Sequence, residues 1–439
     1  MKNIMFKTFI CILLVSSGLL FFACKKETPQ ANRFTVNFIN TNISSIELDE
    51  GSLIPQPSTP VKEGYTFIGW FKDSEFSCEF DFSSQQIYED MNIYAKWLKN
   101  PVLSYNPNGG TLHSKRQYTG SELKSTFTIS DMNISKPGFI FTGWNSKRDG
   151  SGNEIKNSIT ITEDTTIYAQ WKLATSNNAL EQEFLTLLAQ ISTLEEKGYE
   201  YLNKEDFNDI SSTVLSYIRS VRYADTSWSI LAGAINSGFK KYVDNQSLSP
   251  DPRTLKELPT LNIFGQGPVD FVHMIGTLSL TYKKDQSKSD LGGWGGDCAQ
   301  LATDIKNYDE DLDGLIEIAK SKFLNGGYFS LEDYNADLDA VVIASYMTNG
   351  KTLSEAIQHH YRQLADGTSR EKLFFDIRFK NNTDTKEEFR NTCYNSFNKN
   401  YWINLWLDKN NIGENQYKNH IKASVYAFSD YLYDCVYNK

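Results

Sequence analysis

The chain of 439 residues has few of the side chains that bind transition metals, with five histidines and six cysteines. Cys78, Cys298, Cys393 and Cys435 are far apart in the sequence, and no CxxC pair occurs. Structural zinc centres usually draw on closely spaced pairs, so a zinc site is not expected. Cys393 and Cys435 lie in the same part of the chain, and the sequence leaves their disulfide state open.

Positive charge is also scarce. The chain has 44 lysines and arginines against 54 aspartates and glutamates, which gives a formal net charge of −10. Proteins that bind nucleic acid normally carry a basic surface, so nucleic acid is not an expected partner.

Proline is missing from a long part of the chain. Seven of the eleven prolines lie at or before Pro137, the other four lie between Pro250 and Pro268, and none follows. The last 171 residues, 439 minus 268, therefore contain no proline to interrupt a helix.

The N-terminal apolar run, FICILLVSSGLLFFA at residues 9–23, is too short to cross a bilayer as a helix, which takes ~20 residues. Because it follows Lys2 and Lys7, residues 1–23 are predicted to be a secretory signal peptide.

Ala23-Cys24 resembles the end of a bacterial lipobox, although Phe21 stands where leucine is usual. The resemblance implies a lipid, such as palmitate, on Cys24, with residues 24–33 as a polar tether. The protein is then expected to be exported and anchored in the cell envelope. An ordinary cleaved signal or an uncleaved anchor is the alternative, and the choice between inner and outer membrane stays open.

A phrase is repeated in the first half of the chain. GYTFIGWF at 64–71 is followed by GFIFTGWN at 138–145, an offset of 74 that also relates NIYAKW at 92–97 to TIYAQW at 166–171. Earlier in the unit the offset is smaller: 69 from Gly51 to Gly120 and 67 from Phe38 to Tyr105. The second unit therefore has extra residues before Gly138. Apolar and polar residues alternate in these segments, which predicts strands whose tryptophans, Trp70 and Trp144, pack in a core.

The pattern G-aromatic-x-F-x-G-W, followed by D-x-x-I-Y-A-x-W, resembles the Listeria–Bacteroides repeat, or internalin B-repeat. Copies are placed at 34–98 and 99–172. The resemblance implies compact, β-grasp-like units that occur in tandem on bacterial surface proteins and contain no catalytic residues. The alternative role of Trp70 and Trp144, carbohydrate stacking, is less favoured than core packing.

After Trp171 the apolar spacing becomes helical, as in Leu180, Phe184, Leu187 and Ile191. Residues 173–439 are therefore predicted to form one all-α domain. The fold class is multidomain, with two small β-rich repeats before this helical domain. A long loop at 247–268 precedes the segments that carry candidate sites.

Two of those segments suggest a cysteine hydrolase. Asp270 and His273 share a face of a predicted helix, and Asp297-Cys298 follow a glycine-rich stretch at a helix start, where a thiol pKa falls. His273 as base, Asp270 as its orienter and Cys298 as nucleophile would make an amidase or peptidase. A metal site from His273, Asp297 and Asp304 is another construction. Alternatively, His273 and Cys298 are core residues and Asp297 caps a helix.

A third segment, DEDLDGLI at 309–316, resembles an EF-hand calcium loop. Asp309, Asp311 and Asp313 stand at positions 1, 3 and 5, but Lys320 replaces the glutamate at position 12. The alternative is a solvated acidic loop that caps the next helix. Ser330 and Asp333 are predicted to cap a helix that carries Asp337 and Asp339. His359-His360 is interpreted as an exposed helix face rather than a metal site.

The sequence therefore predicts a lipid-anchored envelope protein in which two repeats space a helical domain that binds a protein or glycan. The alternative is a cell-envelope hydrolase with its site at His273 and Asp297-Cys298, so enzymatic activity stays undecided. Calcium is the one cofactor that the residues suggest.

Overall fold

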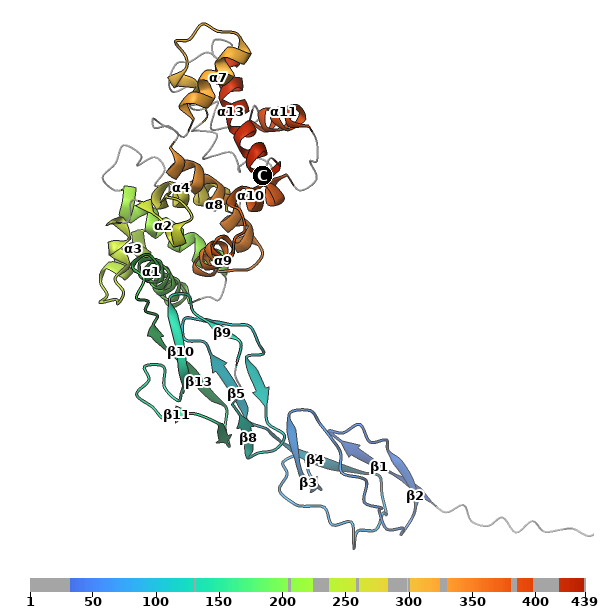
Figure 1. Cartoon of the computed structure of the whole chain (residues 1–439). Coiled ribbons are helices and arrows are strands. Elements are labelled where there is room, and N and C mark those ends of the chain that lie inside the picture. Colours follow the sequence, from blue (N-terminus) through green and yellow to red (C-terminus); the bar gives the residue numbers. More distant parts are fainter. Residues whose placement is uncertain are drawn as a thin grey trace, which may run out of the picture. The chain divides into compact units, whose positions relative to one another are not determined.

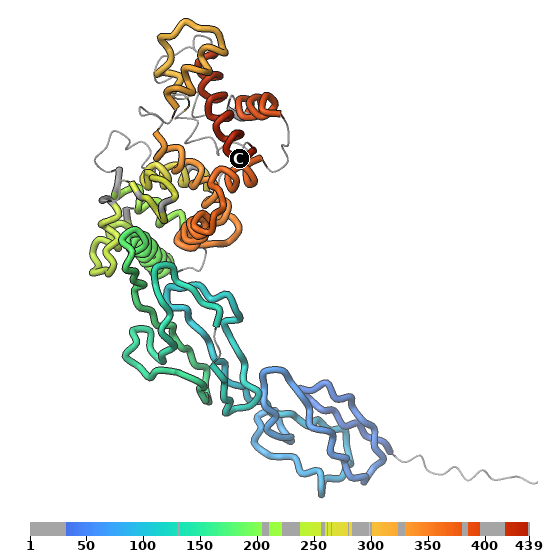
Figure 2. Tube along the Cα trace, viewed as in Figure 1, coloured from blue at the N-terminus to red at the C-terminus, as the bar shows by residue number. Residues whose placement is uncertain are grey.

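The computed structural model describes residues 32–129, 132–203, 207–223, 237–257, 260–282, 298, 301–323, 330–379, 385–397 and 418–437 (Figures 1 and 2). The predicted signal peptide, Cys24 and most of the tether lie outside these residues. Within them, none of the helices combines the length and the apolar character that a membrane span requires.

The first repeat is a four-stranded mixed sheet. Its strands are β1 (Arg33–Ile39), β2 (Ile46–Asp49), β3 (Tyr65–Phe71) and β4 (Met91–Lys99), in the order β2-β1-β4-β3. The central pair, β1 and β4, is parallel, and the outer pairs are antiparallel. This confirms the prediction of a small β-rich unit.

The second repeat has the same central arrangement with additional short strands. Its strands are β5 (Val102–Asn106), β6 (Thr111–Leu112), β7 (Gln117–Thr119), β8 (Ser125–Thr128), β9 (Ile134–Ser135), β10 (Phe139–Asn145), β11 (Glu154–Ile155), β12 (Ser158–Ile161) and β13 (Thr165–Leu173). The main sheet has the order β11-β10-β13-β5-β7, with β5 parallel to β13. β6 pairs with β9, and β8 with β12.

Strand registers confirm the offset of 74 between β3 and β10 and between β4 and β13. Both antiparallel pairs are even interrupted at the same place, between Phe67 and Gly69 and between Phe141 and Gly143. The glycines at these positions suit a bulge, where a strand bends and a backbone comes close.

The equivalence of Gly51 and Gly120 is wrong. Val36 pairs with Ile46, ten residues on, whereas its counterpart Leu103 pairs with Tyr118, fifteen residues on. The second repeat therefore has five additional residues inside its first hairpin, and Gly120 corresponds to Leu48 rather than Gly51. We call residues 107–116, which connect β5 to β7, the insertion loop.

The tryptophans of both repeats are core residues, as predicted. Trp70 and Trp144 are buried, and each packs edge-on against a phenylalanine of its own strand, Phe67 at 5.3 Å and Phe141 at 5.4 Å between ring centroids. Buried rings cannot offer a face to a ligand, so carbohydrate stacking on these tryptophans is excluded.

The C-terminal region is helical, as predicted. Its elements are α1 (Ala179–Leu202), α2 (Phe207–Tyr223), α3 (Ser237–Asp244), α4 (Phe271–Thr281), α7 (Leu312–Lys322), α8 (Leu331–Thr348), α9 (Leu353–Ala365), α10 (Arg370–Arg378), α11 (Lys386–Phe397) and α13 (Lys418–Tyr437). The predicted loop at 247–268 contains short helical turns at Pro252–Glu257 and Ile263–Gly265. A two-residue ladder of β14 (Thr260–Leu261) with β15 (Val269–Asp270) is an exception to the all-α prediction.

Helix α8 lies between two hydrophobic clusters. Its Ala336, Ala340 and Ile343 belong to a cluster with α1, α2, α4 and α9. Its Leu338 and Val342 belong to a second cluster with α7, α10, α11 and α13. Figure 1 shows these two groups of helices on either side of α8. Because both of its faces are buried, α8 holds the helical region together.

Candidate functional site

Asp270 and His273 are brought together, but not in the arrangement that the hydrolase hypothesis requires. Asp270 is the N-cap of α4, and its Oδ1 accepts hydrogen bonds from the backbone amides of Val272 at 2.8 Å and His273 at 2.9 Å. A carboxylate in this position satisfies amides at the helix start. The prediction that Asp270 orients the imidazole of His273 is therefore wrong.

The imidazole of His273 instead lies between two carboxylates of α8. Its Nε2 is 2.9 Å from Oδ1 of the fully buried Asp337, and its Nδ1 is 3.4 Å from Oδ1 of Asp333. Burial raises the pKa of Asp333, although the nearby His273 opposes this shift. Both ring nitrogens of His273 thus lie near carboxylates of α8, which is not the arrangement that the hydrolase hypothesis proposed.

Cys298 does not meet the requirements of a catalytic thiol. It is fully buried and packs in the cluster that contains Leu301, Ile305 and Phe428, whereas Met274 and Ile275 beside His273 belong to the other cluster. A nucleophile must be accessible to substrate. This burial fits the alternative of a core cysteine.

The other members of the hydrolase and metal constructions give no further support. Asp297 lies outside the described residues. Burial raises the pKa of Asp304. Among the residues that the structure describes, no three His, Cys, Asp or Glu side chains come close enough together to hold a metal ion. Cys393 and Cys435 are not joined by a disulfide.

The acidic segment before α7 has the geometry of a helix cap. Asp309, Asp311 and Asp313 are all exposed, and Asp311 is the N-cap of α7, accepting from the amide of Gly314 at 2.8 Å. This is the arrangement expected of the alternative, a solvated capping loop. The calcium hypothesis itself stays a prediction.

The interpretation of His359-His360 as an exposed helix face is wrong for His360. Its side chain is fully buried, and Nε2 lies 2.5 Å from Oδ1 of Asp339. The same carboxylate accepts from Tyr361 Oη at 2.6 Å and from Arg370 Nε at 2.7 Å. The group is an internal ionic network in which α8, α9 and α10 meet.

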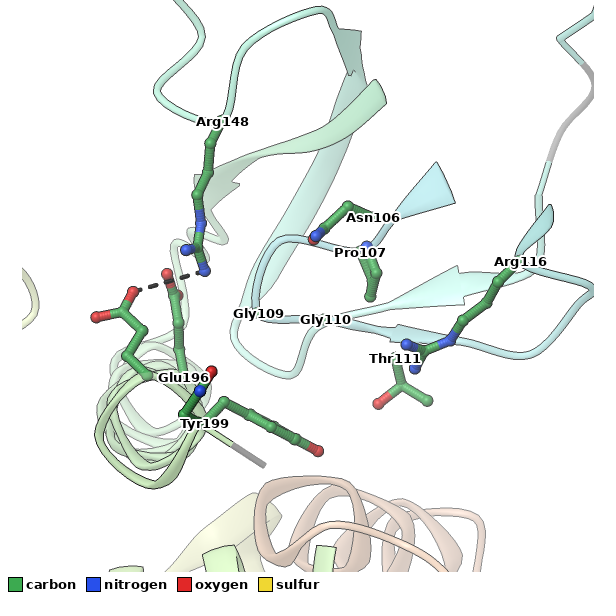
Figure 3. Close-up of a pocket in the computed structure, with 11 residues that line it drawn as sticks. Asn106, Pro107, Gly109, Gly110, Thr111, Arg116, Arg148, Glu196 and Tyr199 are labelled. Atoms are coloured by element: carbon green, nitrogen blue, oxygen red, sulfur yellow. Dashed lines mark ion pairs between the residues drawn. The ribbon is translucent and has the colours of Figure 1, made fainter. Parts of the chain in front are cut away.

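A solvent-accessible site lies elsewhere, where the second repeat meets the helical region. A pocket of about 370 Å³ is lined by Asn106, the insertion loop, Arg148 of the RDGSG turn and α1 with its C-cap, from Glu196 to Asn203 (Figure 3). The insertion loop and Arg148 thus form one wall of the pocket, and α1 forms the other.

Contacts across the junction hold these two walls together. Nζ of Lys136 is 2.8 Å from Oε2 of Glu196, and Nη2 of Arg148 is 3.5 Å from Oε1 of Glu200. Ser192 of α1 donates to the carbonyl of Pro137 at 2.8 Å. The second repeat is therefore joined to α1 by charged and polar contacts.

The charges that line the pocket are held in defined places. Burial alone would raise the pKa of Glu200, but hydrogen bonds from Lys197 and Tyr242 and the positive charges of Lys197 and Arg148 lower it overall. Glu200 is therefore anionic at neutral pH. Nε of Arg148 also donates to Oδ1 of Asn108 at 3.1 Å, which fixes the guanidinium at the mouth of the pocket.

Sequence reasoning missed the charged residues of this pocket. The only signal was the difference in offset between the repeats, which indicated an insertion before Gly138. A length difference locates an extra loop, but it does not say which distant helix will face that loop, as Glu196 of α1 does at Gly109.

Two family models match the chain. The Listeria-Bacteroides repeat domain matches residues 34–96 and 102–170, and a family described as "YkzU uncharacterised protein" matches residues 273–438.

Three similar proteins are longer than this chain. "Putative membrane protein" and "Putative Gly-rich membrane protein", both of Evansella cellulosilytica, are 33% and 29% identical over 33% and 41% of this chain, covering 22% of each relative. Internalin H of Listeria monocytogenes is 27% identical over 33% of this chain and 26% of its own length. The chain thus matches about a quarter of the length of these relatives. Residues 34–96 and 102–170 are two copies of the Listeria-Bacteroides repeat, followed by a helical region similar to an uncharacterised family.

Proposed function

We propose that this is an exported protein of the bacterial cell envelope, held by a lipid on Cys24, that presents its helical region to a partner outside the membrane. The observation that carries the proposal is the pair of Listeria-Bacteroides repeats behind an apolar N-terminal run that ends at Cys24. Relatives that match part of the chain are named as membrane proteins and as an internalin.

The two repeats have different parts in this proposal. The first is a self-contained sheet with its own core, so it is suited to be a spacer. The second is joined to α1 by contacts such as Lys136 to Glu196, so it forms part of the unit that is presented. Cys298 is buried, and both ring nitrogens of His273 lie near carboxylates. These observations favour binding over hydrolysis as the task of this unit.

The Cys24→Ala variant tests the anchor. Without the thiol no lipid can be attached, so the variant is expected in the soluble fraction, whereas the unaltered protein is expected with membranes and to incorporate labelled palmitate. Cys78→Ala is the matched control, because Cys78 is an exposed cysteine of the first repeat. Membrane retention of the Cys24→Ala variant would contradict the proposal.

A further inference from the structure

We propose that the pocket between the insertion loop and the end of α1 binds a neutral saccharide unit. The inference deepens the proposed function, on which it rests for the presence of such a ligand outside the cell. It names a site and a ligand class for the presented unit.

One wall of the pocket is built from residues that the first repeat lacks. The first repeat closes its sheet with a hairpin five residues shorter, as the pairs Val36–Ile46 and Leu103–Tyr118 show. The additional residues belong to the insertion loop, which supplies one wall of the pocket. A binding loop added to a rigid scaffold is a common way in which a repeated unit acquires a function.

Charges of both signs line the pocket. Arg116 and Arg148 face the pocket from the second repeat, and Glu196 and Glu200 face it from α1. A charged ligand would therefore meet a wall that carries its own sign of charge. A neutral ligand with many hydroxyl groups can accept from the guanidinium groups and donate to the carboxylates.

The charged groups that line the pocket are held in place by contacts within the protein. Arg148 is held by Asn108 and Glu200, and Glu196 is held by Lys136, whose side chain is only 6% exposed. An arginine has five N–H donors, so the donors that these contacts do not use can serve a ligand. Fixed polar groups lower the entropy cost of binding.

An aromatic side chain is part of the pocket wall. Tyr199 lines the pocket, and Figure 3 shows it extending from α1 toward Thr111 beneath the turn at Gly109 and Gly110. A tyrosine offers an apolar ring and a polar hydroxyl together, which matches the alternating C–H and O–H groups of a sugar. The pocket volume of about 370 Å³ lies in the range of small-molecule sites, roughly 300–1,000 Å³.

Saturation-transfer NMR and titration calorimetry on the chain from residue 24 onward would test the proposal. The neutral probes are N-acetylglucosamine and glucose, and the charged probes are glucuronate and inorganic phosphate. We expect neutral probes to bind and charged probes to bind more weakly. Tyr199→Ala and Arg116→Gln are expected to weaken binding at least about fivefold, because each removes a direct contact of this kind.

Matched controls separate the site from general effects. Tyr88→Ala removes a tyrosine that is 60% exposed in the first repeat, and Arg33→Gln removes an exposed arginine there, so both should leave binding unchanged. Arg116 is exposed, so its variant reports on binding even if Tyr199→Ala, which also loses packing against the helical core, does not fold.

The outcomes distinguish this inference from the proposed function. No binding of the neutral probes, preferential binding of the charged ones, or binding that Arg116→Gln leaves unchanged would each overturn the saccharide site. None of these results affects the membrane anchor, which the Cys24→Ala fractionation tests separately. Release of the unaltered protein from membranes would instead overturn the proposed function.

Discussion

Asp339 and Glu195 are both buried carboxylates of the helical region, yet their surroundings shift their pKa values in opposite directions. Burial alone would raise the pKa of Asp339, but Arg370 and His360 outweigh burial and hold it well below its usual range. Within the described part of the chain Glu195 has no cationic partner of this kind, and burial raises its pKa to about 7.

Asp339→Ala should strongly destabilise the protein. The variant leaves the guanidinium of Arg370, only 7% exposed, without its carboxylate, and an unpaired buried charge costs about 3–5 kcal/mol. Urea unfolding measures this loss. Asp376→Ala is the control, because its exposed pair with Lys372 should contribute less than about 1 kcal/mol. Equal losses in the two variants would contradict the assignment of a buried network.

Glu195 should make stability fall as pH rises. Burial, with a smaller contribution from the nearby Glu355, favours the protonated form in the folded state and outweighs the hydrogen bonds that Ser354 donates, such as that from its amide at 3.0 Å. The folded protein then binds more protons than the unfolded chain between pH 4.5 and about 7, and the free energy of unfolding decreases across that window.

Glu195→Gln should reduce this pH dependence, because glutamine has no proton to lose. The difference in slope between the two proteins, integrated over the window, should be of the order of 3 kcal/mol, since each pKa unit corresponds to about 1.4 kcal/mol. Denaturant unfolding at several pH values measures it. Parallel curves for the two proteins would show that Glu195 titrates normally.

For single residues, the sequence predicted the strand or helix that carries a side chain better than it predicted the contacts of that side chain. The alternation in the repeats was enough to place Trp70 and Trp144 in a core, because an isolated sheet has one face to bury. Helical spacing put His359 and His360 on a helix, but it could not tell that His360 would meet Asp339 and Arg370. Those contacts depend on how three helices pack, which no local pattern encodes.

Among the elements, the sequence predicted where α8 begins, but not that α8 packs between two hydrophobic clusters. Ser330 and Asp333 form the expected capping box, with the hydroxyl accepting from the amide of Asp333 and the carboxylate accepting from the amide of Ser330. A helix buried on both faces has no single apolar stripe, so periodicity does not show which helices surround it. The sequence indicated extra residues before Gly138, but that five of them lie inside the first hairpin required the strand registers.

The junction between the second repeat and α1 can be tested at one glycine. Gly138 has φ of +78°, and a Cβ added there would fall on the backbone nitrogen of Ala189 in α1. Gly138→Ala therefore combines backbone strain of about 1–2 kcal/mol with a clash that separates the two elements. Gly64 is the equivalent glycine of the first repeat, with φ of +74°.

Gly138→Ala is expected to lose clearly more stability than Gly64→Ala. Calorimetry of the two variants gives the comparison, since Gly64→Ala introduces backbone strain at a similar positive φ. Similar losses would mean that the approach of Gly138 to Ala189 is not important for stability.

For the whole molecule, the structure divides into two compact units, with most of the second repeat in the same unit as the helices. A domain count from length alone does not show this, because both repeats have the same sequence pattern. Lys136 and Ser192 make polar contacts that join the second repeat to α1. The sequence around either residue does not identify its partner.

Trp144→Ala and Trp70→Ala should therefore have different effects on the helices. Each removes the same buried side chain from an equivalent strand, at a cost of about 3–5 kcal/mol to its repeat. Only Trp144→Ala is expected to lower the melting temperature of the helical circular dichroism signal, because its repeat is joined to α1. A helical signal that melts alike in both variants would show that the second repeat unfolds independently of the helices.

The central strand pair has a mechanical consequence. In each repeat the strand that enters the sheet and the strand that leaves it, β1 with β4 and β5 with β13, are parallel neighbours. Tension on the two ends of a repeat would slide these strands along each other and strain their shared hydrogen bonds together, instead of opening them one by one. The barrier to forced unfolding, which sets its rate, should then be high. A protein held at one end by a lipid and at the other by a bound partner could thus be pulled without its repeats unravelling.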